Sequence, residues 1–197
     1  MSHNITIEGG TSVRLPTAGK YCDRDILVSA TVVGDTTTED GLVTRTITEY
    51  SNDRVTSIGA SSFMNCASLK TIDCPNVTSV GNRAFSQSGI TRLEFPKLTS
   101  IGGDACTYCY SLTYADLGNV ASLPSWTFSS CRELRTLILR KTGTITTLSV
   151  TNALSDTAIA KGTGYIYVPD NLVEQYKAAA NWSTYASQIK PISELEG

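Results

Sequence analysis

The sequence predicts a solenoid of stacked coils in which each coil contributes one short β-strand. Three observations support this prediction. One phrase occurs four times, and its copies begin at Val55, Val77, Leu98 and Val120. The copies follow one another in steps of 22, 21 and 22 residues. The apolar residues also keep the same order in every copy. A fixed period of this length is typical of a repeat architecture.

Each copy is expected to form one coil with two apolar walls. A triplet with apolar ends and an outward middle residue has the period of two that a strand requires. It occurs as Ile72-Asp73-Cys74, Leu93-Glu94-Phe95, Ala115-Asp116-Leu117 and Leu137-Ile138-Leu139. The opening pair of each copy, such as Val55 and Ile58, lines the opposite wall. The glycines that follow three of these pairs permit a sharp turn, and they are Gly59, Gly81 and Gly102.

The two ends of the chain differ from its repetitive middle. Residues 1–34 are expected to form an N-terminal β segment, 35–41 a polar linker, and 42–168 the repeats. Residues 169–197 are expected to form a helical cap that covers the open strand edge of the last coil. Within this cap the apolar positions predict a helix over Asp170–Ala180, capped by Asp170 or Asn171. A short second helix should follow and end at Pro191.

Composition argues against several classes of protein. The 16 basic and 18 acidic residues give a formal net charge of −2, which disfavours a general nucleic-acid binder. No apolar run is long enough to cross a bilayer, so membrane insertion is not expected. The first ten residues lack the basic region and the apolar core of a secretory signal. This is consistent with three alternatives: a protein that stays where it is made, one that leaves the cell by lysis or in a particle, and one whose N-terminus was trimmed.

The six cysteines are expected to be free thiols. Cys66, Cys109 and Cys131 share one column of the repeat, and Ser88 fills that column in the second copy. Stacked residues of one column have parallel Cα–Cβ vectors, which disfavours a disulfide. Cys106 and Cys109 match a C-x-x-C pattern, but it lacks both the context of a redox motif and a second pair of zinc ligands.

The sequence predicts no enzyme activity, no metal site and no cofactor. His3 is the one histidine, so no nucleophile–histidine pair can form within the repeats. Glycine pairs occur without the spacing of a phosphate-binding loop. A pair of carboxylates could still hydrolyse a glycoside, but nothing in the sequence marks a cleft.

The repeats resemble leucine-rich repeats of the BspA-like (Treponema-type) subfamily. The shared features are the T-S-I-G phrase, the segment Ser62-Phe63-Met64-Asn65-Cys66, and L-x-x-I-x-x-P from Leu69 to Pro75. This resemblance covers about residues 42–168, and the C-terminal stretch is similar to the end of such proteins. It implies a surface-exposed protein that adheres to or binds a partner without catalysis. A shorter stretch, Leu15–Ala30, is similar to segments of phage and prophage tail-associated proteins, which implies a virion or a prophage origin.

The outward side chains of the strands form the candidate ligand-binding face. Its residues are Asp73, Arg92, Glu94, Tyr114, Asp116, Ile138, Tyr165 and Tyr167. One interpretation is a site for a cation, a basic peptide or a glycan, with the tyrosines as stacking surfaces. The other is a solvated strand face, in which Lys70 and Arg92 offset the acidic groups. Like charges that lie opposite each other on a sheet are destabilising.

Two functions are consistent with the sequence and the resemblance. The first is a recognition or adhesion module that binds a protein or glycan partner at a cell surface. The second is a structural phage tail or particle component, in which residues 1–41 make an assembly contact and the solenoid is a passive spacer. The location is unknown, and the resemblance implies an extracellular, cell-surface or virion protein.

Overall fold

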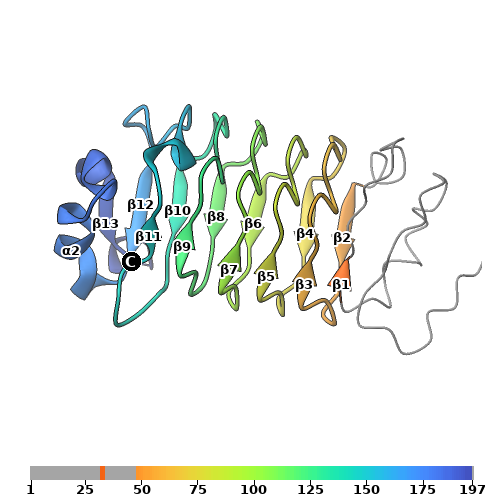
Figure 1. Ribbon diagram of the computed structural model, residues 1–197, viewed down its shortest axis with the longest axis horizontal. Helices are drawn as coiled ribbons and strands as arrows, with labels where there is room; N and C mark the ends of the chain where they lie inside the picture. Colours follow the sequence, from red (N-terminus) through yellow and green to blue (C-terminus); the bar gives the residue numbers. More distant parts are fainter. Residues whose placement is uncertain (1–31, 34–47, 197) are drawn as a thin grey trace, which may run out of the picture.

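The computed structural model describes residues 32–33 and 48–196 of the 197-residue chain. Within this part the chain winds into coils that stack along the long axis of the molecule (Figure 1). The predicted solenoid is therefore confirmed. The N-terminal β segment, the linker over 35–41 and the assembly contact through residues 1–41 fall almost entirely outside the described residues.

One wall of the solenoid is built from the predicted strands, and we call it the strand sheet. Its strands pair in parallel in the order β13-β12-β10-β8-β6, while β2 and β4 form a separate pair. Their bounds are β2 Glu49–Ser51, β4 Thr71–Asp73, β6 Arg92–Glu94, β8 Tyr114–Asp116, β10 Thr136–Ile138, β12 Tyr165–Val168 and β13 Ile189–Pro191. Tyr114 lies opposite both Arg92 and Thr136, and Thr136 lies opposite Tyr165. This register is the one that the repeat alignment predicts.

The opposite wall is a second set of parallel strands, where the sequence predicted only an apolar wall. Each strand has two residues: β1 Val32–Val33, β3 Ser57–Ile58, β5 Ser79–Val80, β7 Ser100–Ile101, β9 Ser122–Leu123 and β11 Thr147–Leu148. They pair in the orders β1-β3-β5-β7 and β9-β11. Because Val32 pairs with Ser57, this sheet already begins upstream of residue 42.

A third row of backbone hydrogen bonds joins the coils on the loop side, and all of these bonds point the same way. In each coil, alternate amides donate to carbonyls of the next coil. The amides of Ser61, Phe63 and Asn65 begin the row, at N–O distances of 2.7–2.9 Å. The row continues through the third coil, where Cys106 donates to Thr127 at 2.8 Å.

This loop-side row requires left-handed backbone at two positions of each coil. The first position is occupied by Ser61, Arg83, Asp104 and Trp126, and the second by Asn65, Gln87, Tyr108, Ser130 and Asp156. Their φ angles lie between 55° and 63°. A non-glycine residue in this conformation carries a steric cost. Repeated at equivalent positions, that cost is offset by the hydrogen bonds between coils.

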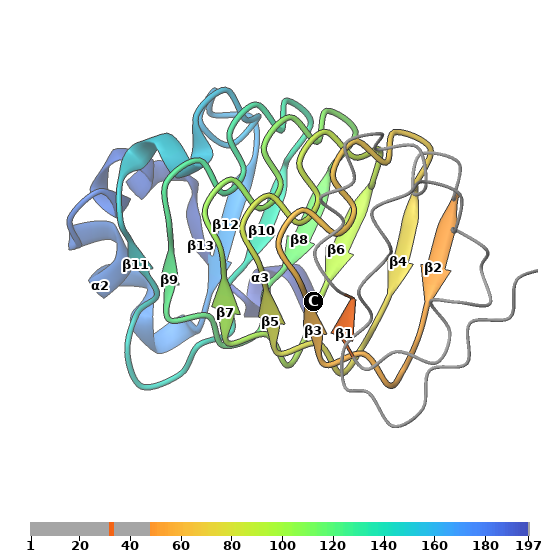
Figure 2. The same ribbon diagram turned by 45° about the vertical axis from the view of Figure 1, so that its right-hand side comes forward.

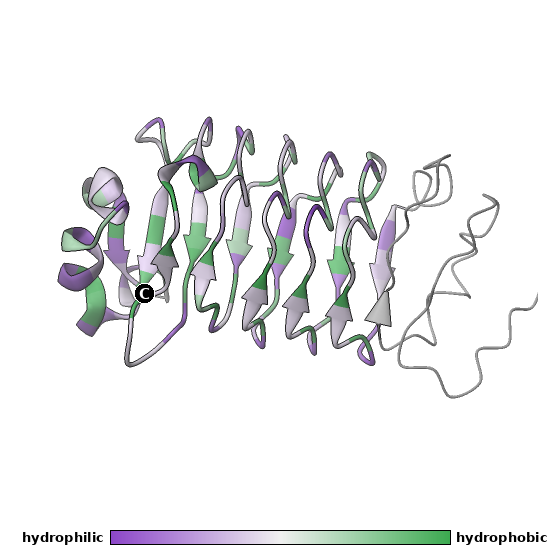
Figure 3. Cartoon of the chain, viewed as in Figure 1, coloured by the Kyte–Doolittle hydropathy of each residue, from purple (hydrophilic) through white to green (hydrophobic). Residues whose placement is uncertain are grey.

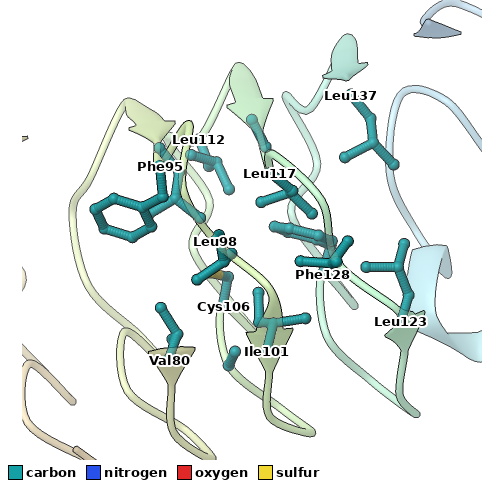
Figure 4. Close-up of a cluster of buried hydrophobic side chains, with 14 of the residues drawn as sticks. Val80, Phe95, Leu98, Ile101, Cys106, Leu112, Leu117, Leu123, Phe128 and Leu137 are labelled. Carbon is teal, nitrogen blue, oxygen red and sulfur yellow. The ribbon is translucent and has the colours of Figure 1, made fainter. Parts of the chain in front are cut away.

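The core lies between the two walls (Figure 4). Figure 3 shows that hydrophobic residues follow the strands, while the lower turns are more hydrophilic. The rings of Phe63 and Phe85 stack in parallel with their centroids 5.4 Å apart, and Tyr50 extends the row at 5.4 Å from Phe63. These contacts join successive coils, so the stability of one coil depends on its neighbours.

Two of the predicted turn glycines are required for close stacking and not for their backbone angles. Neither Gly81 nor Gly102 has a positive φ. A Cβ on Gly81 would lie 2.5 Å from the backbone nitrogen of Ala60, and one on Gly102 would lie 2.5 Å from that of Asn82. The coils therefore approach each other here more closely than any side chain allows.

The C-terminal cap differs in detail from the prediction. The stretch 170–180 divides into the 3₁₀-helix η2, Asp170–Leu172, and the helix α2, Val173–Ala178. Neither Asp170 nor Asn171 caps a helix, because Pro169 holds the N-terminal position and no side chain bonds there. The second helix is the 3₁₀-helix η3, Trp182–Gln188, which ends before Pro191; the residues up to Pro191 form β13. The short helix α3, Ser193–Glu196, follows.

The cap covers both walls of the last coil. Its strand β13 pairs with β12 and so covers that edge of the strand sheet, as predicted. On the other wall, Thr146 lies beside β11, and its amide donates to the Tyr176 hydroxyl at 2.7 Å. The Trp182 Nε1–H donates to the carbonyl of Thr146 at 2.7 Å, and the side-chain Nδ2 of Asn181 donates to the carbonyl of Leu148 at 2.8 Å. Side chains thus replace the hydrogen bonds that a further coil would supply.

The five described cysteines, Cys66, Cys74, Cys106, Cys109 and Cys131, are buried and free, as predicted. The Cys109 thiol donates to the carbonyl of Phe85 at 2.9 Å, and the Cys131 thiol to that of Cys106 at 3.0 Å. Ser88 and Cys109 are neighbours in the predicted column, with Oγ and Sγ 3.4 Å apart. Burial raises the pKa of Cys74 to about 12, from an ordinary value of 9.0.

We expect the protein to lose stability between about pH 9 and pH 12. The unfolded chain releases the Cys74 proton near its ordinary pKa, whereas the folded chain retains it up to the raised value. Unfolding is therefore favoured as the pH rises, by about 1.4 kcal/mol per pH unit for each such group. Urea unfolding at several pH values measures this loss. The variant Cys74→Leu, which has the residue type of Leu117 and Leu139, should lose less; an equal loss would contradict the assignment to Cys74.

Candidate functional site

The strand sheet presents its predicted ligand-binding residues in two columns. On one side Arg92, Tyr114, Thr136 and Tyr165 follow one another in register. On the other side Glu94 lies opposite Asp116, and Ile138 lies opposite both Asp116 and Tyr167. Asp73 occupies the equivalent position on β4, but β4 does not pair with β6. The structure therefore brings seven of the eight residues onto one continuous sheet and leaves Asp73 beyond a gap.

An aromatic ring and two opposite charges form a compact group at β6 and β8. The guanidinium of Arg92 lies over the Tyr114 ring, 3.8 Å from its centroid. The same Arg92 donates from Nε to the Glu94 carboxylate at 2.6 Å. Burial raises the pKa of Tyr114, and the carboxylates of Asp116 and Glu94 add to this effect. The charge of the Glu94 carboxylate is therefore already compensated by Arg92 on the same strand.

The prediction that Asp116 and Ile138 are available on this face is wrong. Asp116 is only 8% exposed, and Arg140 Nε donates to its two carboxylate oxygens at 3.1 and 2.9 Å. Ile138 is fully buried, although it does not belong to the core cluster between the walls. Figure 2 shows α3 beyond the strand sheet, on the side away from the other wall. The Asp116 carboxylate and the Ile138 side chain are thus not exposed on this face.

A second aromatic group lies on β12, next to the cap. Tyr165 is 41% exposed, and its ring centroid is 6.4 Å from that of Tyr167. The amine of Lys190 lies 4.5 Å from the centre of the Tyr165 ring. Lys190 also contacts the Glu194 carboxylate at 2.8 Å, and this contact raises the pKa of Lys190. The cap therefore contributes a cation to the face, which the sequence did not predict.

The space between β4 and β6 is a pocket of about 320 Å³. Its wall consists of residues from both strands and from the residues just before them: Lys70, Thr71, Ile72, Asp73, Thr91, Arg92 and Glu94. The sequence predicted Asp73, Arg92 and Glu94 as ligand-binding residues, but not that a pocket separates them. The one available signal was the 21-residue step between the second and third copies, which shortens this coil by one residue.

A group of exposed aromatic residues on the loop side was missed by the sequence analysis. Tyr108, Tyr110 and Trp126 are 44%, 50% and 45% exposed. The rings of Tyr108 and Tyr110 are 6.0 Å apart, and the guanidinium of Arg132 lies 5.1 Å from the centre of the Tyr110 ring. The equivalent positions in the other copies carry no aromatic residue, which is the signal that could have found them.

The described residues contain neither a cluster of metal ligands nor a membrane-spanning helix. Among residues 48–196 no three cysteine, histidine or acidic side chains lie together as metal ligands would. No helix in the described part of the chain is long and apolar enough to cross a bilayer. The C-x-x-C thiols of Cys106 and Cys109 are buried in the core.

Comparison with known protein families identifies the family of this chain. The model of the BspA type leucine-rich repeat region matches residues 45–157 with six copies, which is more than half of the sequence. The chain belongs to the BspA-type leucine-rich repeat family. The matched range extends beyond the four regular copies on both sides. Leucine-rich repeat proteins generally bind other proteins and are generally not enzymes.

Solved leucine-rich repeat structures resemble this one. A leucine-rich repeat protein from Eubacterium ventriosum is 23% identical over 62% of this chain and 32% of its own, with a TM-score of 0.50, which supports the fold. A leucine-rich cell surface protein from Faecalibacterium prausnitzii is 22% identical over 64% of this chain and 42% of its own, with a TM-score of 0.44. The chain thus spans less than half the length of these relatives. No curated protein matches the sequence.

Proposed function

We propose that this leucine-rich repeat chain is a non-enzymatic recognition module that binds a protein or glycan partner at a cell surface. The binding face is the outer side of the strand sheet, at the aromatic groups on β6–β8 and β12. The observation that supports it best is the pairing of rings with cations: Arg92 on Tyr114, and Lys190 on Tyr165. Tyrosine and arginine are enriched at the centres of protein interfaces.

Charge pairing on this face favours a partner with rings or hydroxyls over a simple cation. Glu94 is paired with Arg92, and Asp116 with Arg140. A bound cation would have to displace an arginine from either carboxylate. The exposed Tyr165 ring and the half-buried Tyr114 and Tyr167 rings instead offer flat apolar surface with a hydroxyl at the edge, which suits both protein side chains and sugar rings.

The proposal is tested by binding the labelled 197-residue chain to intact Gram-positive gut bacteria and animal epithelial cells, with and without competing glycans. We expect saturable binding to one cell type. The variants Tyr165→Ala and Arg92→Ala should each weaken it by about tenfold or more, because truncation of an interface anchor costs more than about 1.4 kcal/mol.

Tyr110→Ala is the matched control, because it removes a ring of similar exposure from the loop side. It should leave the affinity unchanged. Affinity that survives in both strand-face variants, or that falls only with Tyr110→Ala, would place the binding surface elsewhere. A folded, monomeric protein that binds neither cell type would contradict recognition at these surfaces.

A further inference from the structure

The strands β4 and β6 separate toward their carboxyl ends. At their beginning the amide of Thr91 still donates to the carbonyl of Lys70 at 3.2 Å. Just after the end of β4, the described residues Cys74 and Glu94 do not form the bond from the Cys74 N–H to the Glu94 carbonyl. The equivalent bonds in the next coils are present: Phe95 to Asp116 at 3.0 Å, Leu117 to Ile138 at 3.1 Å and Leu139 to Tyr167 at 2.9 Å.

The separation lies between the first regular coil and the second, which is the shortened one. The residue missing from the second copy falls just before β6, where Gly89 packs on the preceding coil. A Cβ on Gly89 would lie 2.1 Å from the carbonyl oxygen of Ala67 and 2.9 Å from the amine of Lys70. The two strands are close together at their beginning and separated at their carboxyl ends, so they are tilted relative to each other. The gap is therefore built into the backbone and does not depend on a surface side chain.

The gap contains two charges of opposite sign that do not neutralise each other. Lys70 lies before β4 and Asp73 at its end, three residues apart, which corresponds to about 10 Å along a strand. Both are exposed, and within residues 48–196 neither has an ion pair. The other charges of the pocket, Arg92 and Glu94, are paired with each other.

We propose that this pocket binds a short peptide-like zwitterion, with the ligand's carboxylate at Lys70 and its ammonium group at Asp73. The inference rests on the proposed recognition function and names the ligand chemistry of one part of that face. A neutral sugar would leave both charges unmatched, and a metal ion would find only one carboxylate without a cation beside it. An extended peptide of three residues spans about 10 Å, which matches the spacing of Lys70 and Asp73 along the chain.

The side chains of the pocket wall suit a peptide as well as its charges do. Thr71 and Thr91 add hydroxyl groups to the wall. The volume of about 320 Å³ lies at the small end of ligand pockets and suits a tripeptide better than a long chain.

The test is a titration of the ¹⁵N-labelled full chain with triglycine, observed by NMR. We expect saturable shifts confined to residues 70–74 and 91–94. N-acetyl-triglycine lacks the ammonium group and triglycinamide lacks the carboxylate, so each should bind at least tenfold more weakly. Lys70→Gln and Asp73→Asn should each weaken triglycine binding by tenfold or more. Glu133→Gln, which changes an exposed charge outside the pocket, should have no effect.

Equal affinity for triglycine and both blocked peptides, or no shift at any concentration, would overturn the inference. Unchanged thermal unfolding of the variants excludes misfolding as the cause of lost binding. Cell binding of the same variants separates this inference from the proposed function. If the chain binds cells but not triglycine, the inference about the pocket is overturned and the proposed function stands. If the chain binds triglycine but no cells, the inference about the pocket is supported and the proposed function is contradicted.

Discussion

Replacing Trp182 by alanine is expected to lower the free energy of unfolding by about 3–5 kcal/mol, the usual cost of truncating a buried aromatic residue. Trp182 is fully buried and meets the Tyr176 ring edge-on, with centroids 5.4 Å apart. It also holds the carbonyl of Thr146 through its Nε1–H. Urea unfolding followed by far-UV circular dichroism measures the loss.

The variant Trp182→Phe separates packing from hydrogen bonding at the cap. It retains most of the buried ring but leaves the Thr146 carbonyl without its donor, so we expect a smaller loss of about 1–3 kcal/mol. Should both variants remain as stable as the parent, the cap would not be required to close the solenoid. Should both lose the same large amount, the hydrogen bond would matter more than the ring.

Replacing Phe85 by alanine is expected to have an effect of similar size, about 3–5 kcal/mol. Phe85 is fully buried, and it contacts Phe63 in one coil and Phe95 in its own. Its loss removes packing between two coils as well as within one. Because each coil depends on its neighbours, unfolding should remain one cooperative transition at a lower urea concentration.

Phe85→Leu is the control, because it keeps most of the apolar volume and removes only the ring contacts. We expect it to lose less than half as much stability as Phe85→Ala. An alanine variant that unfolds in two separate transitions would show that the coils before and after Phe85 are stable independently. That outcome would contradict the dependence between neighbouring coils.

The register of the strand sheet could be predicted because a repeat fixes it. Once Arg92 and Tyr114 occupy the same position of two copies, stacking places them opposite each other, whatever the remaining details. The second wall was harder to predict, because a strand of two residues such as Ser57–Ile58 has no period that can be counted. The left-handed backbone at Tyr108 and Trp126 could not be predicted either, because most of the residue types at these positions rarely adopt a positive φ.

The candidate site was predicted in part, and its errors have physical reasons. Ile138 occupies the outward position that the period of two requires, but an apolar residue at that position was itself a sign of burial. Asp116 was counted as a free carboxylate because its partner, Arg140, lies 24 residues away in sequence. The pocket between β4 and β6 depends on backbone tilt, which residue types alone do not specify.

The one-way hydrogen bonds of the loop side limit how this chain can be lengthened. Every regular coil offers amides to the next, and the last coil accepts from the amides of Phe128 and Ser130 at 2.8 Å. It does so through the carbonyls of Ala153 and Ser155, within and just after the 3₁₀-helix η1, Thr151–Leu154. A duplicated coil inserted between two regular coils meets matching donors and acceptors on both sides. A coil appended at this end would have to displace the cap, which already pairs with β12 and holds Thr146. Longer relatives of this chain should therefore grow by internal duplication and retain their final turn.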